Sequence, residues 1–367
     1  MTSSTSRIAL GLMSGTSLDG IDAALIETDG WSYVRPGLAT TVVYEKDFRE
    51  RLRRLLDGEG KVAQIERELT LLHAEAVRRL LDYAGLPRER VEVLGFHGQT
   101  ILHAPARRRT WQIGDGGLLA RATRIPVVND FRSADVAAGG QGAPFAPLYH
   151  AALSAELPRP LAVLNLGGVG NVTWIGEGEG NLLAFDTGPA NALIDDWVAR
   201  RGKTGFDEGG RLAKAGKVDT EALQRLLDHP YFAAPAPKSL DRNAFDPAPV
   251  ESLALEDGAA TLTAFTVESV ARALSLLPAP PRRWLVTGGG RHNPVLMDSL
   301  ASRLEVAVEP VEAVGWNGDA LEAQAFAYLA VRSLEGWPLS LPGTTGVAEP
   351  ITGGIYHAAR RAGRPPA

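Results

Sequence analysis

The sequence predicts an α/β protein of two domains, and three observations lead to this class. The chain has 367 residues, long enough for about two domains with cores of their own. Short apolar runs that end in glycine-rich turns recur along it, and long helical patterns lie between them. Buried strands mixed with long helices are typical of the α/β class.

Short segments rich in Val, Leu and Ile are predicted to be buried strands, each followed by a Gly-rich turn. They span 7–15, 91–98, 161–170 and 284–290. Two of them open a strand–turn–strand pattern, at 8–27 and 161–175. This weak internal echo indicates that each pattern begins one half of a duplicated architecture.

The clearest predicted helix covers 61–83, where apolar residues recur at spacings of three and four and charged residues occupy the opposite face. Others are predicted over 258–277, stopped by Pro278, and over 318–334. A Gly/Pro-rich join at 137–147 is predicted to act as a hinge. The predicted domains are therefore 1–140 together with 350–367, and 141–349.

Composition excludes several classes of protein. The chain contains no Cys, which excludes disulfides, thiolate catalysis, zinc fingers and iron–sulfur ligation. Its formal net charge is −5, so it lacks the basic footprint of a nucleic-acid-binding protein. No apolar run is long enough for a signal peptide or a membrane helix. We therefore expect a cytoplasmic protein with no nucleic-acid or membrane partner.

The segment GLMSGTSLDGID, residues 11–22, has two interpretations that are compatible. One is a β-hairpin whose turn is Asp19-Gly20. The other is a phosphate-binding turn, in which Gly15 lets the backbone approach and Thr16 and Ser17 donate hydrogen bonds. Asp19 or Asp22 would then hold Mg²⁺, directly or through water.

Other phosphate motifs fail when their spacing is tested. A Walker A loop ending at Gly202 needs Gly where Trp197 stands, and a dinucleotide-binding motif starting at Gly168 needs Gly where Thr173 stands. The triple glycine 288–290 does not complete such a motif either. It follows an apolar run, and indicates tight strand–helix packing or a flat surface for adenine or ribose.

Asp186 lies in FDTGPAN, residues 185–191, after an apolar run. An Asx-turn that opens a helix is one interpretation, and a lone general base at a cleft is the other. An aspartic protease needs two such motifs in an all-β fold, which this chain lacks. With the ordinary Asp pKa of about 3.9, the carboxylate would be ionised at neutral pH.

Further polar residues stand at the ends of predicted elements. FHGQT, residues 96–100, puts His97 and Gln99 at a strand end, where a structural role for His97 is favoured over a catalytic one. Arg132 is a candidate clamp for an anionic group, or one half of a surface ion pair. Glu322 falls in the first turn of a predicted helix, from which it would point into a cleft.

Taken together, these segments resemble the anhydro-N-acetylmuramic acid kinase family across nearly the whole chain. The resemblance rests on GLMSGTSLDGID, FHGQT, NDFRSADVAAGGQGAPFAP (129–147), LNLGGVGN (164–171), FDTGPAN and TGGGRHNP (287–294), in family order. The chain departs from the family at 238–242, where KSLDR replaces the more usual KSTGRE. That departure concerns local loop contacts rather than the reaction.

The resemblance implies the actin/hexokinase-like fold, with a duplicated core and ATP in the cleft between two domains. It implies an ATP- and Mg²⁺-dependent kinase that opens the anhydro bridge of 1,6-anhydro-N-acetylmuramic acid with water and phosphorylates O6, in cell-wall sugar recycling. Another sugar kinase or a phosphatase of this fold is the alternative, and a non-catalytic sugar sensor is disfavoured. For the oligomeric state, a homodimer is one option.

The resemblance also assigns site residues. Asp186 matches the catalytic residue of that family. From the phosphate-turn interpretation of residues 11–22, Asp19 is the candidate Mg²⁺ ligand. The ATP-binding residues would be Gly15, Thr16, Ser17, Leu18, Asp19, Gly20, Ile21, Asp22, Gly167, Gly168, Gly288, Gly289 and Gly290. The sugar-binding residues would be His97, Gln99, Arg132 and Glu322.

Overall fold

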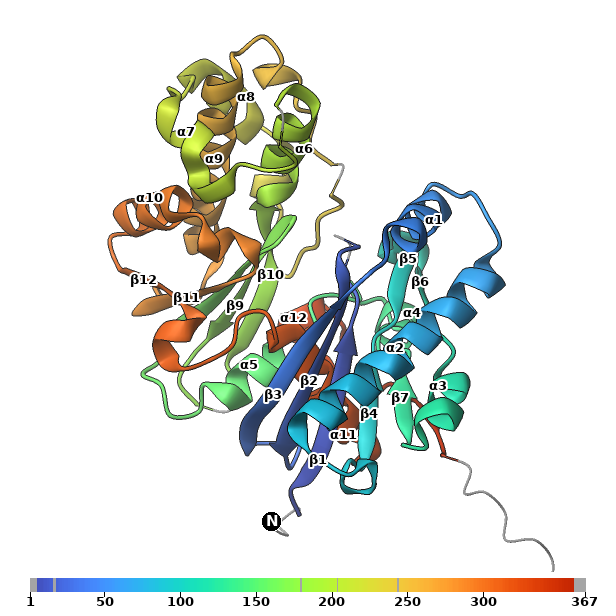
Figure 1. The fold of residues 1–367 in the computed structure, drawn as a ribbon. Helices are drawn as coiled ribbons and strands as arrows, with labels where there is room; N and C mark the ends of the chain where they lie inside the picture. The colour runs from blue at the N-terminus through green and yellow to red at the C-terminus, as the bar shows by residue number, and fades with distance from the viewer. Residues whose placement is uncertain (1–4, 16–17, 179, 203, 243, 360–367) are drawn as a thin grey trace, which may run out of the picture. The chain divides into compact units, whose positions relative to one another are not determined.

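The computed structural model describes residues 5–15, 18–178, 180–202, 204–242 and 244–359 (Figure 1). The chain forms two compact units. Unit 1 takes its residues from Met1–Ala155 and Asp319–Ala367, and unit 2 is Glu156–Gly318. Within the described ranges, no helix is both long and apolar enough to cross a bilayer.

Unit 1 is built on a six-stranded sheet with the strand order β13-β7-β4-β1-β2-β3. Its helices and strands are β1 (Arg7–Met13), β2 (Gly20–Thr28), β3 (Val34–Val43), α1 (Lys46–Leu56), α2 (Val62–Ala84), β4 (Val93–Phe96), β5 (Gln99–Ala104), β6 (Arg109–Ile113), α3 (Gly116–Thr123), β7 (Val127–Asn129), α4 (Ser133–Ala137), α5 (Pro147–Leu153), α11 (Leu321–Leu334), α12 (Pro342–Thr345) and β13 (Ile355–His357). Strands β5 and β6 pair as a separate hairpin.

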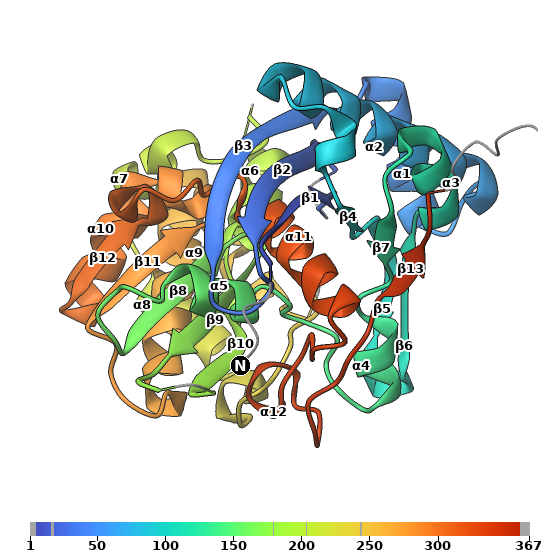
Figure 2. The same cartoon turned by 90° about the horizontal axis from the view of Figure 1, so that it is seen from below.

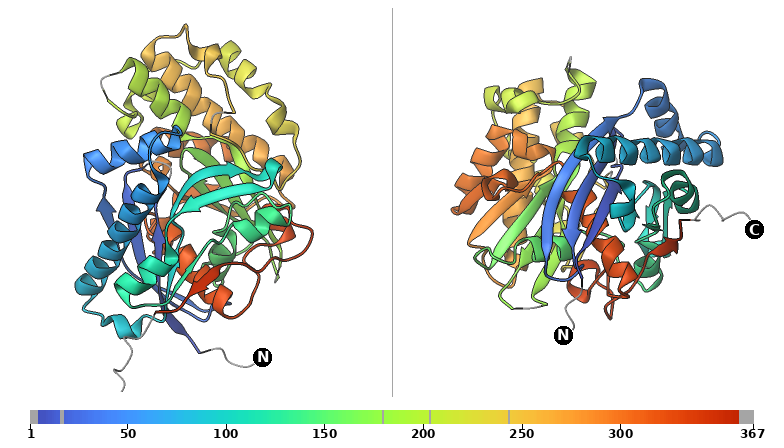
Figure 3. Two further views of the ribbon diagram at one scale, coloured as in Figure 1. Left: turned by 90° about the vertical axis from the view of Figure 1, so that its right-hand side faces the viewer. Right: turned by 60° about the horizontal axis from the view of Figure 1, so that its bottom comes forward.

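Unit 2 is built on a five-stranded sheet with the order β10-β9-β8-β11-β12. Its elements are β8 (Leu161–Leu166), β9 (Val169–Ile175), β10 (Leu182–Pro189), α6 (Asn191–Arg201), α7 (Arg211–Ala215), α8 (Thr220–Leu227), α9 (Leu255–Ala273), β11 (Arg283–Thr287), α10 (Pro294–Leu304) and β12 (Ala307–Pro310). Helix α9 is packed against α6, α7, α8 and α10 (Figure 3).

The two sheets repeat one topology, which confirms the predicted duplication. In unit 1, β1 is antiparallel to β2 and parallel to β4, β2 is antiparallel to β3, and β4 is parallel to β7. Unit 2 repeats this arrangement. There, β8 is antiparallel to β9 and parallel to β11, β9 is antiparallel to β10, and β11 is parallel to β12. The weak sequence echo between 8–27 and 161–175 is therefore two equivalent hairpins, β1–β2 and β8–β9.

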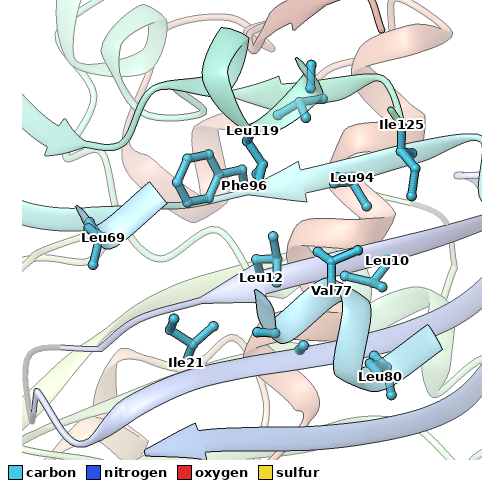
Figure 4. Close-up of a cluster of buried hydrophobic side chains, with 14 of the residues drawn as sticks. Leu10, Leu12, Ile21, Leu69, Val77, Leu80, Leu94, Phe96, Leu119 and Ile125 are labelled. Carbon is cyan, nitrogen blue, oxygen red and sulfur yellow. The ribbon is translucent and has the colours of Figure 1, made fainter. Parts of the chain in front are cut away.

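One face of the unit 1 sheet is covered by α2. The predicted apolar spacing is buried there, because Leu69, Val77 and Leu80 pack with Leu10 and Ile21 of the sheet (Figure 4). Helix α2 then ends at Gly85, whose left-handed φ of 58° suits a residue without a side chain.

The other face of that sheet is covered by α11 (Figure 2). Gly11 of β1 and Gly95 of β4 are register partners and let the helix backbone touch the sheet. A Cβ built on Gly11 would lie 1.7 Å from the Ala323 carbonyl oxygen, and one on Gly95 would lie 2.0 Å from that of Phe326. The helix position is therefore set by two positions that admit only glycine.

Two local expectations differ from the structure. Asp19-Gly20 is not a two-residue hairpin turn, because Met13 pairs with Asp22 and the connection is longer. The compact units change at Ala155 and Asp319, whereas the predicted domains change at 140 and 350. The reason is that α5 and α11 pack with each other and α11 packs on the unit 1 sheet.

Candidate active site

The turn between β1 and β2 holds the first predicted phosphate-binding residues. Gly15 accepts a hydrogen bond from the amide of Leu18 at 3.2 Å, and Leu18 has a left-handed φ of 57° with its side chain buried. Thr16 and Ser17 lie outside the described residues. Gly20 and Ile21 open β2, where the Ile21 side chain is fully buried in the core.

The β4–β5 turn supports the β1–β2 turn. The Ser14 hydroxyl donates to Oε1 of Gln99 at 2.7 Å and lies 2.7 Å from the Tyr44 hydroxyl. All three groups are buried, and Gln99 has no exposed surface. The structure thus places Gln99 under the turn that carries Gly15, as a support for that turn.

The two carboxylates of this region have different surroundings. Asp19 is exposed and accepts from Arg49 at 2.6 Å, whereas Asp22 is half-buried and accepts from the Thr41 hydroxyl at 2.6 Å. Burial raises the pKa of Asp22, with the negative charges of Asp319 and Asp19 adding to the shift.

No cluster of three or more His, Asp or Glu suited to a metal is present in the part of the chain that is described. Mg²⁺ bound with a nucleotide needs only one or two carboxylates, since phosphates and water complete its shell. Asp22, which has no cationic partner among the described residues and sits in a field of negative charge, fits that requirement better than Asp19.

His97 and Arg132 form a buried pair. Nδ1 of His97 lies 2.8 Å from the carbonyl oxygen of Gly98, so the imidazole proton is on Nδ1. Nε2 therefore accepts from Nε of Arg132 at 3.0 Å, and Nη1 of Arg132 donates to the Gly142 carbonyl at 2.6 Å. Burial and the Arg132 charge hold the pKa of His97 well below its usual range.

Glu322 lies in the first turn of α11. Its side chain is exposed to solvent on one side and is closely surrounded by protein on the others. That enclosure raises the pKa of its carboxyl, Arg132 opposes the shift, and Asp22 adds to it. Burial lowers the pKa of Arg132 to about 10, against the attraction of Glu322 and Asp135. Unit 1 thus places Glu322 within reach of the charges of both Arg132 and Asp22.

In unit 2, the predicted glycine turns meet at the ends of β8, β10 and β11. The carbonyls of Gly167 and Gly168 accept from the amides of Asn191 and Ala190, both at 3.0 Å. The Asn191 side chain in turn donates to the Leu166 carbonyl at 2.8 Å.

The triple glycine after β11 adjoins the same strand end. Gly288 has a φ of 76°, and a Cβ on Gly290 would lie 2.6 Å from that of Leu166. A Cβ on Gly289 would instead meet its nearest neighbour, Nδ2 of Asn191, at 3.9 Å. The packing interpretation is therefore confirmed at Gly290, while Gly289 has an exposed, open surface and its role in nucleotide binding stays a prediction.

Asp186 lies within β10, just before the bulge between Asp186 and Gly188. The Asx-turn interpretation is wrong, because Oδ2 accepts from the distant amide of Leu240 at 2.7 Å. The expected ordinary pKa is also wrong: burial raises the pKa of Asp186 to about 7, against the lowering effect of the Leu240 hydrogen bond.

Tyr231 is a neighbour of Asp186 that sequence reasoning did not single out. Its hydroxyl donates to the backbone carbonyl of Asp186. It lies in a Pro-rich stretch, residues 230–249, and no local sequence pattern there indicates a contact with Asp186, 45 residues earlier in the chain. The sequence signal that pointed to this region is the departure from the family motif at 238–242, because this stretch contains Leu240, whose amide binds the Asp186 carboxylate.

A core sheet that is built twice with one strand order places the chain in the actin/hexokinase-like class of two-domain α/β proteins. The family model for anhydro-N-acetylmuramic acid kinase matches residues 7–358. The chain therefore belongs to the anhydro-N-acetylmuramic acid kinase family, and neither a phosphatase nor another sugar kinase is favoured.

Curated relatives agree with this membership. The anhydro-N-acetylmuramic acid kinase of Paramagnetospirillum magneticum is 60% identical over 353 residues, covering 95% of this chain and 99% of the relative. That of Rhizorhabdus wittichii is 57% identical over 362 residues, covering 96% and 99%. Among solved structures, the Acidaminococcus fermentans (R)-2-hydroxyglutaryl-CoA dehydratase component A is 11% identical with a TM-score of 0.49, covering 90% of this chain and 99% of that one.

Proposed function

We propose that this chain uses ATP and water to convert 1,6-anhydro-N-acetylmuramic acid into N-acetylmuramic acid 6-phosphate and ADP. Family membership supports the reaction, and one observation carries its chemistry: the Asp186 carboxylate has one oxygen fixed and a pKa of about 7. A cytoplasmic site of action in cell-wall sugar recycling belongs to the same proposal.

Asp186 would act as the general base. It takes one proton from water while the water oxygen bonds to C1 and the C1–O6 bond breaks. The released O6 then takes the γ-phosphoryl group of ATP, so that ADP leaves and no separate acid has to protonate O6. A base whose pKa lies near the working pH combines a large ionised fraction with useful basicity.

The glycine turns would bind the nucleotide. The β1–β2 turn, with Gly15, Leu18 and Asp19, would face the β- and γ-phosphates, and Gly167 and Gly168 form its equivalent in unit 2. The open surface at Gly289 would lie against the adenosine. Asp22 would hold Mg²⁺, which offsets the charge of phosphate oxygens during transfer.

Arg132 would bind the carboxylate of the sugar's lactyl group. Two of its nitrogens are occupied by His97 and Gly142, which fix the guanidinium plane and leave Nη2 for a ligand. Glu322, with its solvent access, would accept hydrogen bonds from sugar hydroxyls. His97 and Gln99 are buried and would support the site through Arg132 and the turn at Ser14.

A panel of sugars incubated with Mg-ATP tests the proposal, with ADP release as the readout. We expect turnover with the 1,6-anhydro sugar and little with N-acetylmuramic acid, whose bridge is already open. Turnover should rise with pH, with a midpoint at about 7, because the Asp186 carboxyl ionises over this range. Equal rates with both sugars would contradict the coupled ring opening and indicate a simple hexose-type kinase.

A further inference from the structure

Asp186 is held by a segment that lies far from it in sequence. We call residues 230–240 the clamp segment. The amide of Asp186 donates to the Lys238 carbonyl at 2.9 Å, and the amide of Leu240 donates to Oδ2 at 2.7 Å. The hydroxyl of Tyr231 donates to the Asp186 backbone carbonyl. Both the peptide and the carboxylate of Asp186 are therefore oriented by this segment.

The clamp segment also contributes a lysine whose backbone is bonded to Asp186 and whose ammonium is held by Tyr231. Lys238 is 9% exposed, and its carbonyl is bonded to the Asp186 amide. Its ammonium nevertheless donates to the Tyr231 carbonyl at 2.9 Å and lies 4.3 Å from the centroid of the Tyr231 ring. A cation over an aromatic ring is held electrostatically, the more so when it is partly desolvated.

The other elements around Asp186, as far as their residues are described, present no comparable cation. From β9, the register partner is Asn171. From α9, Ser269 lies beside Gly188, while Glu268 pairs with Arg303 at 2.6 Å and Arg272 donates to the Leu227 carbonyl at 2.8 Å. Arg242, which follows the clamp segment, pairs with Asp196 at 2.7 Å. Among the described residues of unit 2, Lys238 is thus the cationic residue whose backbone is bonded to Asp186.

We propose that Tyr231 is a positioning residue that withholds the Lys238 ammonium from the Asp186 carboxylate, so that Asp186 can take a proton from water. An ammonium within about 4–6 Å would lower the pKa of a carboxyl by roughly one to three. Such a shift would leave a weak base, and the value of about 7 indicates that Lys238 does not act on Asp186 in this way. The inference rests on the proposed role of Asp186 as the base.

Three variants and a conservative control test this pair. Tyr231→Leu removes the ring and leaves the ammonium only the backbone carbonyl of residue 231, so Lys238 should turn toward Asp186 and the midpoint of Asp186 ionisation should fall by about one pH unit or more. Lys238→Met alone should leave the midpoint in place. Combining Tyr231→Leu with Lys238→Met should return it to the wild-type value. Tyr231→Phe keeps the ring and should also titrate like the wild type.

The midpoint is measured directly by ¹³C NMR of protein labelled at aspartate carboxyls, with the Asp186 signal identified by its loss in Asp186→Asn. The pH profile of turnover is the second readout. The proposal is overturned if Tyr231→Leu leaves the midpoint unchanged, if the double variant shifts as far as Tyr231→Leu alone, or if Lys238→Met raises it. Unimpaired turnover in Asp186→Asn would instead refute the proposed function, while the NMR midpoints would still test the pair.

Discussion

The two units share one sheet topology but use its third strand differently. In unit 1, β3 is a mostly exposed strand, whereas in unit 2 the equivalent β10 is largely buried and carries Asp186. The hairpin turns also differ, because residues 14–19 join β1 to β2 and only Gly167 and Gly168 join β8 to β9. Duplication therefore supplied the scaffold twice, and the chemistry depends on what was packed against each copy.

The largest expected effect comes from Asp186, the carboxylate that has no counterpart on β3. Asp186→Asn keeps the shape of the side chain but removes the base, so turnover should fall by roughly 10²–10⁴-fold. ATP binding, measured on the same sample, should change little. Asp196→Asn on α6, whose side chain pairs at the surface with Arg242, is the matched control. Turnover of Asp186→Asn within about threefold of wild type would remove the functional contrast between the units.

The next effect concerns the packing that distinguishes unit 1. Gly11→Ala would push a Cβ into the Ala323 carbonyl, which is backbone and cannot swing aside. We expect a loss of about 3 kcal/mol or more in the free energy of unfolding, measured with urea. Gly205→Ala, where a Cβ meets nothing within 4 Å, should stay within about 0.5 kcal/mol of wild type. Equal stability of both variants would contradict the backbone contact of α11.

A smaller effect is expected at the buried pair of unit 1. His97→Phe removes the acceptor for Arg132, so the guanidinium loses its orientation and the KM for the sugar should rise about tenfold. His97→Gln can restore an acceptor and should rise less. The kcat value and the KM for ATP should stay near wild type in both, because Asp186 and the glycine turns are untouched. A rise confined to kcat would argue against a role through Arg132.

The last effect is a pH dependence of stability. A carboxyl pKa raised to about 7 in the folded state means that the native protein holds its proton longer than the unfolded chain does. The wild type should therefore lose stability as pH rises from about 4 to 7, an effect absent from Asp186→Asn. Urea midpoints at pH 5 and pH 8 should show a larger drop for the wild type. Parallel drops in the two proteins would contradict the raised pKa.

Local patterns were enough to predict much of the scaffold. The predicted helix over 61–83 is α2, and the strand–turn–strand echo became the duplicated hairpins, because apolar spacing and glycine turns are recorded within short stretches. The raised pKa of Asp186 was missed, since its oxygen is bound by Leu240, 54 residues away, and its burial depends on the whole unit. The predicted Asp19-Gly20 turn failed for a related reason, because hairpin register is set by the strands rather than by the dipeptide.

The discontinuity of unit 1 affects how the protein is made. Unit 2 is one uninterrupted stretch of chain, but the sheet of unit 1 receives α11 only after that whole stretch has left the ribosome. At a synthesis rate of roughly 5–20 residues per second, β1 stays uncovered for on the order of 15–60 s until α11 has been made. During that interval the apolar face around Gly11 and Gly95 is bare, so nascent-chain chaperones have a defined surface to protect until Leu334 emerges.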